Sequence, residues 1–329
     1  MKIATEVKDA KTIGISGHIR PDGDCVGACM ALYLYLKKVY PEKEVELFLE
    51  QPSEVFRCIK DIDQIRTDLE EGAEKEGDFD VFIALDTAKE RLGAAEALFD
   101  RAGKTINIDH HVSNPGSGMV NYIDTQASST SELVFDVMEE DEIDVEIAKA
   151  IYIGIVHDTG VFRYSNTSPK TMAIGAKLLS FGFDHSDLIE KTFYEKTYVQ
   201  NLLLGRALLE SILIMDGKCI VSAIGKRTLD FYQASPKDLE GVVSQLNQTE
   251  GTECTIFMYQ TGVQEYKVSL RSKGKVDVAQ VAQYFDGGGH VRAAGCTMNG
   301  TFYDVVNNLT LHIERQLKMA DNSQDEGIA

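Results

Sequence analysis

The sequence predicts an α/β protein with two domains: an N-terminal domain built on a mainly parallel sheet with helices on both faces, and a smaller mixed α/β C-terminal domain. In the first half of the chain, short apolar runs alternate with longer amphipathic stretches. This alternation is typical of strand–helix–strand units, whose parallel strands are joined by crossover helices. At 329 residues the chain is long enough for two domains of ordinary size.

The expected strands of the N-terminal domain are short apolar runs that end at polar residues. They are TIGISGH (12–18), VELFLE (45–50), VFIALD (81–86) and KTINID (104–109). The expected helices cover residues 25–39, 128–140, 144–157, 170–181 and 185–193. Serine and threonine residues before Glu132 indicate a capping box. Ser168-Pro169 is a typical helix start.

The N-terminal domain is expected at residues 1–194, and a segment with few helix breakers, 195–210, predicts a connecting helix. The C-terminal domain is expected at 211–320, with a polar, disordered tail at 321–329. Its expected strands are SILIMD (211–216), CIVSAI (219–224), CTIFMYQ (254–260) and YKVSLRS (266–272). Its expected helices are 276–285 and 301–320.

Composition excludes several classes of partner. The net charge of −19 argues against tight binding to duplex DNA or long RNA, which needs extensive basic surface, although a short nucleotide remains compatible with it. The apolar stretches are too short for a membrane span. The six cysteines have no CxxC spacing, which favours reduced thiols and a cytoplasmic location. Cys25 and Cys29 are expected to be buried. The formation of a homodimer is left as an open alternative.

Histidine and aspartate residues gather in four places along the first half of the chain. The clusters are HIRPDGD (18–24), ALD ending at Asp86, IDHH (108–111) and VHDTG (156–160). Three of them fall at the ends of expected strands, which is where open parallel sheets bind ligands. Carboxylates that are held close together repel one another and resist burial unless cations neutralise them. The clusters therefore predict one shared site for two divalent cations.

A turn in the first cluster is expected to bring its ligands together. Pro21 fixes one backbone angle, and Gly23 permits an unusual one. His18, Asp22 and Asp24 can then converge within a few residues.

The clusters resemble the DHH phosphoesterase family, named for the Asp-His-His that is found here as Asp109, His110 and His111. A second motif, FDGGGHVRAAG at 285–295, resembles the GGGH signature of the DHH-associated C-terminal domain. The resemblance extends from about Thr12 to about Gln316. It is closest to the small stand-alone bacterial members, the nanoRNase (oligoribonuclease)/pAp phosphatase type.

In the N-terminal domain, the resemblance implies two divalent cations. One ion would be held by His18, Asp22 and Asp86, and the other by Asp24, Asp86, His110 and Asp158, so that Asp86 bridges them. Nitrogen and oxygen ligands without thiolate favour Mn²⁺, with Mg²⁺ or Co²⁺ as substitutes. Asp109 would orient a histidine ring, and His111 would bind the substrate phosphate.

In the C-terminal domain, the resemblance implies substrate binding by Arg271, Gly288, Gly289 and His290. Glycines let backbone N–H groups approach a phosphate, and an arginine can donate two parallel bonds to it. The active site would lie in the cleft between the two domains. We expect His157 to be part of the scaffold, and the roles of Arg163 and Arg292 stay open.

The implied function is a manganese-dependent phosphoesterase that hydrolyses nanoRNA, pApA or 3′-phosphoadenosine 5′-phosphate by two-metal activation of water. A cyclic di-AMP phosphodiesterase uses the same two motifs and stays an alternative. A family II pyrophosphatase would lack the GGGH signature, and a RecJ-type exonuclease would carry a further nucleic-acid-binding domain. A non-catalytic nucleotide-binding sensor is disfavoured because all the expected metal ligands are present.

Overall fold

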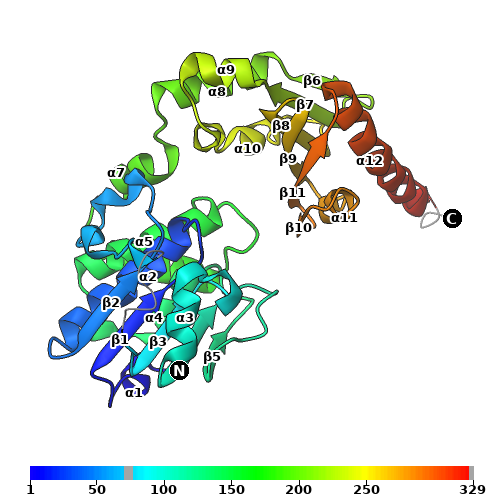
Figure 1. Ribbon diagram of the computed structural model, residues 1–329. Helices are drawn as coiled ribbons and strands as arrows, with labels where there is room; N and C mark the ends of the chain where they lie inside the picture. The colour runs from blue at the N-terminus through cyan, green and yellow to red at the C-terminus, as the bar shows by residue number, and fades with distance from the viewer. Residues whose placement is uncertain (70–76, 326–329) are drawn as a thin grey trace. The chain divides into compact units, whose positions relative to one another are not determined.

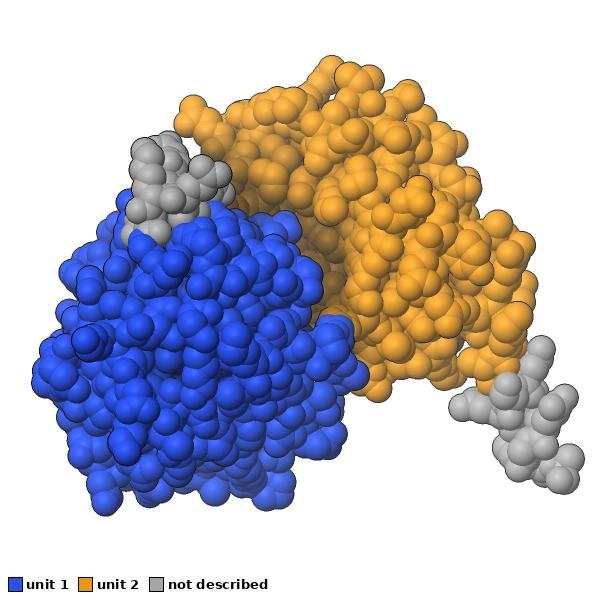
Figure 2. All heavy atoms as spheres, turned by 60° about the horizontal axis from the view of Figure 1, so that its bottom comes forward, with its two compact units in different colours: residues 1–195 blue, residues 196–329 orange. Residues whose placement is uncertain are grey.

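The computed structural model describes residues 1–69 and 77–325. Its chain forms two compact units, unit 1 with residues 1–195 and unit 2 with residues 196–329 (Figure 2). Each unit has its own sheet and its own apolar core (Figure 1).

Unit 1 is built on a five-stranded parallel sheet in the order β2-β1-β3-β4-β5. The strands are β1 (Thr12–Ser16), β2 (Glu44–Phe48), β3 (Val81–Leu85), β4 (Lys104–Asp109) and β5 (Val120–Ile123). The first four strands confirm the expected runs. Strand β5 was not expected, because its four partly exposed residues form no apolar run. The chain passes from β1 to β2 on one side and returns to β3 on the other, so the switch point of the sheet lies between β1 and β3.

Helices cover both faces of this sheet, as expected. Ile15 and Ile83 enter a core shared with α2 (Gly23–Val39), α4 (Thr130–Val137) and α5 (Val145–Thr159). Phe82, on the opposite face of β3, packs against Phe99 of α3 (Glu96–Arg101). Successive residues of β3 enter two different cores, so both faces of the strand are buried. This is why its sequence is one continuous apolar run.

Two glycines allow α2 and α5 to cross at very short range. A Cβ atom at Gly27 would lie 2.7 Å from the carbonyl oxygen of Ala150, and a Cβ atom at Gly154 would collide with Ser131 Oγ. The Cβ atom at Gly154 would also lie 2.8 Å from Asp24 Oδ1. The packing of these helices therefore holds Asp24 against both α4 and α5.

The other helices of unit 1 are short or peripheral. They are α1 (Ile3–Glu6), α6 (Pro169–Leu179) and α7 (His185–Ile189), which runs into a π-helical turn at Glu190–Tyr194. Single 3₁₀ turns lie at Glu54–Cys58, Ile62–Gln64, Lys89–Arg91, Gly93–Ala95 and Glu140–Glu142. Helix α6 begins with the expected Ser168-Pro169, where Ser168 forms a capping box with Thr171.

Unit 2 has a six-stranded mixed sheet in the order β10-β11-β9-β8-β7-β6, in which β7 and β8 are parallel and the other pairs antiparallel. The strands are β6 (Ile212–Ile214), β7 (Cys219–Ile224), β8 (Cys254–Gly262), β9 (Glu265–Ser272), β10 (Gly288–His290) and β11 (Ala293–Asn299). One core is formed with α11 (Val278–Gln283) and α12 (Phe302–Asp325). A second core is formed with α8 (Tyr198–Leu209), α9 (Lys226–Tyr232), the 3₁₀ turn Pro236–Leu239 and α10 (Val242–Leu246).

Three further features of unit 2 concern α8, the GGGH motif and the last helix of the chain. Helix α8 falls in the range expected to connect the domains, yet Leu203 and Ala207 are buried inside unit 2. Part of the GGGH motif, Gly288–His290, forms an edge strand of the sheet. Helix α12 extends to Asp325, five residues beyond the expected end of this helix, and residues 326–329 lie outside the described residues.

Within the described ranges, every helix is too short or too polar to span a lipid bilayer.

Candidate active site

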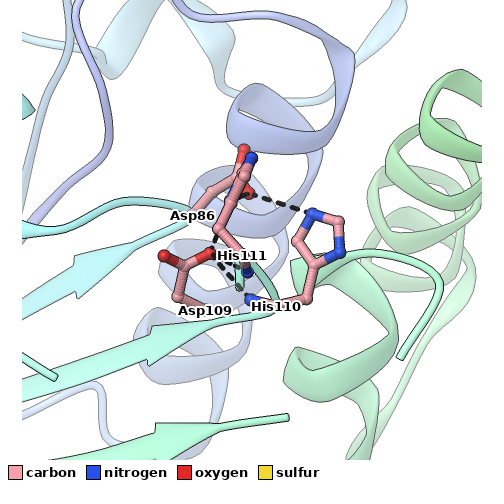
Figure 3. A group of neighbouring side chains, drawn as sticks. All are labelled: Asp86, Asp109, His110 and His111. Atoms are coloured by element: carbon pink, nitrogen blue, oxygen red, sulfur yellow. Dashed lines mark hydrogen bonds and ion pairs between the residues drawn. The ribbon is translucent and has the colours of Figure 1, made fainter. Parts of the chain in front are cut away.

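Acidic and imidazole side chains converge at the carboxyl ends of β1, β3 and β4. Figure 3 shows four of them, from the turns after β3 and β4, gathered around one point. The converging residues come from different parts of unit 1: His18 after β1, Asp22 and Asp24 at the start of α2, Asp86 after β3, Asp109, His110 and His111 at the end of β4, and Asp158 in the last turn of α5. The structure thus brings together every predicted site residue of the N-terminal domain.

Asp86 lies between two groups of donors. Its Oδ2 is 3.4 Å from His18 Nε2, and its Oδ1 is 3.7 Å from His110 Nε2. The Asp86 backbone has φ 61°, a left-handed conformation that is uncommon for residues with a side chain and that clusters at functional sites. Thr130 Oγ1 donates a hydrogen bond of 3.0 Å to Oδ1, and the residue is 2% exposed. Asp86 is therefore fixed with one oxygen toward each group.

The first group is His18 with Asp22. His18 Nδ1 donates to the carbonyl oxygen of Ile19 at 2.9 Å, which directs Nε2 toward Asp22 Oδ1, 3.7 Å away. A histidine whose other nitrogen is held in this way is oriented to ligate a metal. The Cys25 thiol belongs to a further set of mutually close donors with His18 and Asp86, and both Cys25 and Cys29 are buried, as expected.

The second group is His110 with Asp24 and Asp158. His110 Nε2 lies 4.0 Å from Asp24 Oδ2 and 3.3 Å from Asp158 Oδ2. These three residues present ligand atoms within 4.8 Å of one another, a spacing that can hold a metal ion. That the two groups bind two ions, and that the side chains divide between the ions in this way, stays a prediction.

Three carboxyl groups of this cluster, those of Asp24, Asp86 and Asp158, are held where ionisation is unfavourable. Burial, together with the neighbouring carboxylates, raises the pKa of Asp86 to about 8 and that of Asp158 to about 9. Burial also raises the pKa of Asp24. Each carboxylate resists ionisation because the others lie close by in a poorly solvated space. Divalent cations would neutralise these three carboxylates, so the chemistry of the donor set fits them.

Helix α4 contributes to the site in a way that sequence reasoning missed. The backbone N–H groups of Thr130 and Ser131 donate to Asp24 at 2.7 and 2.9 Å. Free N–H groups at a helix start stabilise a nearby carboxylate. The expected capping box is wrong in part. Ser129 accepts from the Glu132 backbone, but the Glu132 carboxylate accepts from Ser128 instead of capping Ser129.

Asp109 orients His111, as predicted for a histidine ring. His111 Nδ1 donates to Asp109 Oδ1 at 2.7 Å, and Asp109 is 0% exposed. This hydrogen bond is the main cause that raises the pKa of His111 to about 9. Asn114, which sequence reasoning missed, donates to Asp109 Oδ2 at 2.6 Å. An asparagine five residues after Asp109 carries no motif that could have identified it.

Gly23 has a different role from the one expected. Its φ is not positive, and the left-handed residue of this turn is Arg20, with φ 55°. A Cβ atom at Gly23 would collide with the ring of His157, which also packs against Phe56 and Phe193 at ring distances of 5.2 and 5.3 Å. Gly23 therefore allows close packing, and His157 is part of the scaffold, as expected.

In unit 2, two of the four predicted substrate residues, Arg271 and His290, lie on one row across the sheet. His290 of β10 pairs with Ala293 of β11, and Ala293 pairs with Arg271 of β9. Residues that are paired directly across antiparallel strands point to the same face. The small side chain of Ala293 leaves a gap between Arg271 and His290, two strand spacings or roughly 10 Å apart. A phosphate group could contact both residues across this gap.

The three glycines before His290 are not equivalent. A Cβ atom at Gly287 or at Gly289 would collide with the backbone of β11, and Gly289 has φ 146°. A Cβ atom at Gly288 would meet nothing within 4 Å among the described residues. The fold itself therefore requires Gly287 and Gly289, while the exposed backbone of Gly288 stays accessible to a ligand.

Together, the two units define an α/β protein with an acidic, histidine-containing centre at a sheet switch point, followed by a mixed-sheet unit with a glycine-rich edge. Residues 12–155 match the N-terminal domain of the DHH family, and residues 216–319 match the DHHA1 domain. The chain therefore combines a DHH family domain with a DHHA1 domain, as the motifs predicted.

Two bacterial relatives and one crystal structure are similar to the chain over most of its length. The bifunctional oligoribonuclease and PAP phosphatase NrnA of Thermus thermophilus is 29% identical over 326 residues, 96% of this chain and 94% of that protein. The protein of the same name from Bacillus subtilis is 28% identical over 293 residues, 87% of this chain and 89% of that protein. The crystal structure of an exopolyphosphatase-related protein from Bacteroides fragilis has a TM-score of 0.89 and 25% identity, with coverage of 97% and 96%.

Replacing Asp158 should stabilise the protein when cations are removed. Its pKa in the folded state, about 9, lies above its ordinary value of 3.8. Its carboxyl group therefore costs no stability at or below about pH 4, and the cost grows as the pH rises toward 9. In a chelator, Asp158→Asn should match the wild type in thermal unfolding near pH 4 and exceed it in Tm at pH 8. Mn²⁺ should raise the Tm of the variant less than that of the wild type.

The exposed Asp141→Asn variant is the control and should follow the wild type at both pH values. An Asp158→Asn variant that is less stable than the wild type at pH 8 in the chelator would contradict the crowding of these carboxylates.

Proposed function

We propose that the chain is a hydrolase of phosphate esters in short nucleotides: RNA fragments of a few residues, pApA, and 3′-phosphoadenosine 5′-phosphate. The observation that carries the proposal is Asp86, whose two oxygens face two separate sets of metal-ligating side chains. The NrnA relatives support the substrate class, because their names describe an oligoribonuclease and a PAP phosphatase and they align over most of the chain.

The proposed cofactors are two divalent cations, preferably Mn²⁺, with Mg²⁺ or Co²⁺ as substitutes. Imidazole and carboxylate donors suit these ions, while Ca²⁺ prefers a larger shell of oxygen atoms. The proposed ligands are His18, Asp22 and Asp86 for one ion, and Asp24, Asp86, His110 and Asp158 for the other. When bound, such a pair lowers the pKa of water and neutralises the charge on a phosphate.

His111 is proposed to bind the phosphate during hydrolysis. Asp109 holds its Nδ1, so the Nε2 side of the ring is left to donate a hydrogen bond. A cationic ring in a fixed orientation stabilises negative charge that builds on the phosphate oxygens in the transition state. The hydrogen bond from Asn114 keeps Asp109 in the position that this role requires.

Unit 2 is proposed to capture the substrate. Arg271 and His290 offer two positive or donor groups to a terminal phosphate, and Gly288 leaves backbone room beside them.

The cysteines within the described residues are free, and five of the six are buried, which supports the proposed cytoplasmic location.

The substrate class can be tested by one comparison with four substrates. We expect the protein with Mn²⁺ to hydrolyse pApA and 3′-phosphoadenosine 5′-phosphate faster than cyclic di-AMP and pyrophosphate. Excess EDTA should abolish turnover, and Mn²⁺ should restore it better than Ca²⁺ does. Faster turnover of cyclic di-AMP would support the alternative substrate, and full activity in excess EDTA would refute the metal-dependent mechanism.

Arg271→Ala should weaken the enzyme most on substrates that carry a terminal phosphate. Loss of one charge-assisted hydrogen bond costs about 1.5–3 kcal/mol, so kcat/KM for pApA should fall roughly 10- to 100-fold. The loss should be much smaller for unphosphorylated ApA. Lys267→Ala is the matched control, because it removes another cation from the same strand. Equal losses on pApA and ApA would show that Arg271 supports the fold rather than the phosphate.

A further inference from the structure

Glu132 is an acidic side chain that lies buried in unit 1 without being one of the proposed metal ligands. It belongs to the first turn of α4 and is 1% exposed. A buried carboxylate is destabilising unless hydrogen-bond donors or a cation replace the water that it has lost. The surroundings of Glu132 supply both, so its side chain is held in one orientation.

Three hydrogen bonds converge on one oxygen of Glu132. Its Oε2 accepts from Ser128 Oγ at 2.7 Å, from the Ser128 backbone N–H at 3.3 Å, and from Thr171 Oγ1 at 2.7 Å. The other oxygen, Oε1, lies 3.3 Å from Lys170 Nζ. Lys170 and Thr171 are in the first turn of α6, so Glu132 joins the start of α4 to the start of α6.

Ser128 is held from a second direction as well. Its carbonyl oxygen accepts from Asn166 Nδ2 at 2.9 Å, and the same amide group donates to the carbonyl oxygen of Asp158 at 3.1 Å. Ser128 is 0% exposed. The segment that leads into α4 is therefore fixed by Glu132 and by Asn166 together.

The residues directly after Ser128 hold two carboxylates of the acidic centre. The backbone N–H groups of Thr130 and Ser131 donate to Asp24 at 2.7 and 2.9 Å. Thr130 Oγ1 donates to Asp86 Oδ1 at 3.0 Å. Because only one residue separates Ser128 from Thr130, a displacement of Ser128 would move the donors that orient Asp24 and Asp86.

We propose that Glu132 is a positioning residue for the second cation, whose proposed ligands include Asp24 and Asp86. It acts through Ser128, which sets the place of the donors on Thr130. The inference rests on the proposed function, because it takes two cations as cofactors. Removing a group that orients a metal ligand typically lowers metal affinity about 10- to 100-fold. Glu132 lies one contact farther from the ligands, so we expect the lower end of this range.

Mn²⁺ binding in two single-ion backgrounds tests this role without relying on turnover. His18→Ala removes a proposed ligand of the first ion, and His110→Ala removes one of the second. Glu132→Leu keeps a side chain of similar size and removes the hydrogen-bond acceptors. Combined with His18→Ala, it should weaken binding of the remaining Mn²⁺ about 10-fold, as measured by electron paramagnetic resonance of the free ion. Combined with His110→Ala, it should leave Mn²⁺ affinity nearly unchanged.

Further variants in the His18→Ala background separate positioning from general stability. Glu132→Gln retains an oxygen that can accept the three hydrogen bonds of Oε2, and it should restore most of the Mn²⁺ affinity. Ser128→Ala removes the single hydrogen bond of 2.7 Å to Glu132, and it should weaken Mn²⁺ by a smaller factor even where Glu132→Leu fails to fold.

Thr105→Val is the matched control. Thr105 is 6% exposed and accepts a hydrogen bond from the Met119 backbone N–H at 2.8 Å, at the opposite end of β4 from Asp109. Its replacement should lower the Tm and leave Mn²⁺ affinity unchanged.

Unchanged Mn²⁺ affinity for Glu132→Leu in the His18→Ala background would overturn the inference, and so would equal weakening in both backgrounds. A wild type that binds two Mn²⁺ ions would leave the proposed function standing in either case. A wild type that binds no Mn²⁺ would overturn the proposed cofactors and the inference together.

Discussion

The shared position of Asp86 is the constraint on which the rest of the site depends. One of its oxygens faces His18 and the other faces His110, so a single carboxylate joins two sets of donors. This position requires a strained backbone turn after β3, a hydrogen bond from Thr130, and nearly complete burial. The topology of the sheet explains where the turn lies, because β1 and β3 are neighbours at the switch point and their carboxyl ends open to the same side.

The packing of unit 1 serves this cluster of charges at a cost in stability. Asp24, Asp86 and Asp158 repel one another, and only part of the repulsion is offset by the start of α4 and by the histidines. Glycines let the supporting elements come close enough to hold the carboxyl groups in place, as at the crossing of α2 and α5 and beside His157. Unit 2 follows a different principle, in which strand pairing alone aligns Arg271 and His290 across Ala293.

The fold of unit 1 and the residues of its site could largely be predicted. An apolar run that ends in aspartate or histidine indicates both a strand and the place of a site residue at the end of that strand. Four of the five strands were expected, whereas β5 is too short and too polar to form a pattern. Asn114 and the N–H groups of Thr130 and Ser131 could not be identified, because their roles depend on contacts between distant segments. The role predicted for Gly23 was wrong because glycine is favoured both in a tight turn and at a point of close packing, and the sequence does not distinguish the two.

The central claim is that Asp86 joins two cation sites, and the number and coupling of bound Mn²⁺ ions test it most directly. Equilibrium dialysis combined with electron paramagnetic resonance would be carried out on the wild type and on Asp86→Ala. The account predicts two Mn²⁺ ions per wild-type chain with a magnetically coupled spectrum, because ions that share a carboxylate lie about 3.5–4 Å apart. In Asp86→Ala the coupled spectrum should disappear. A wild-type protein that binds one isolated ion, or a coupled pair that survives the loss of Asp86, would contradict the account.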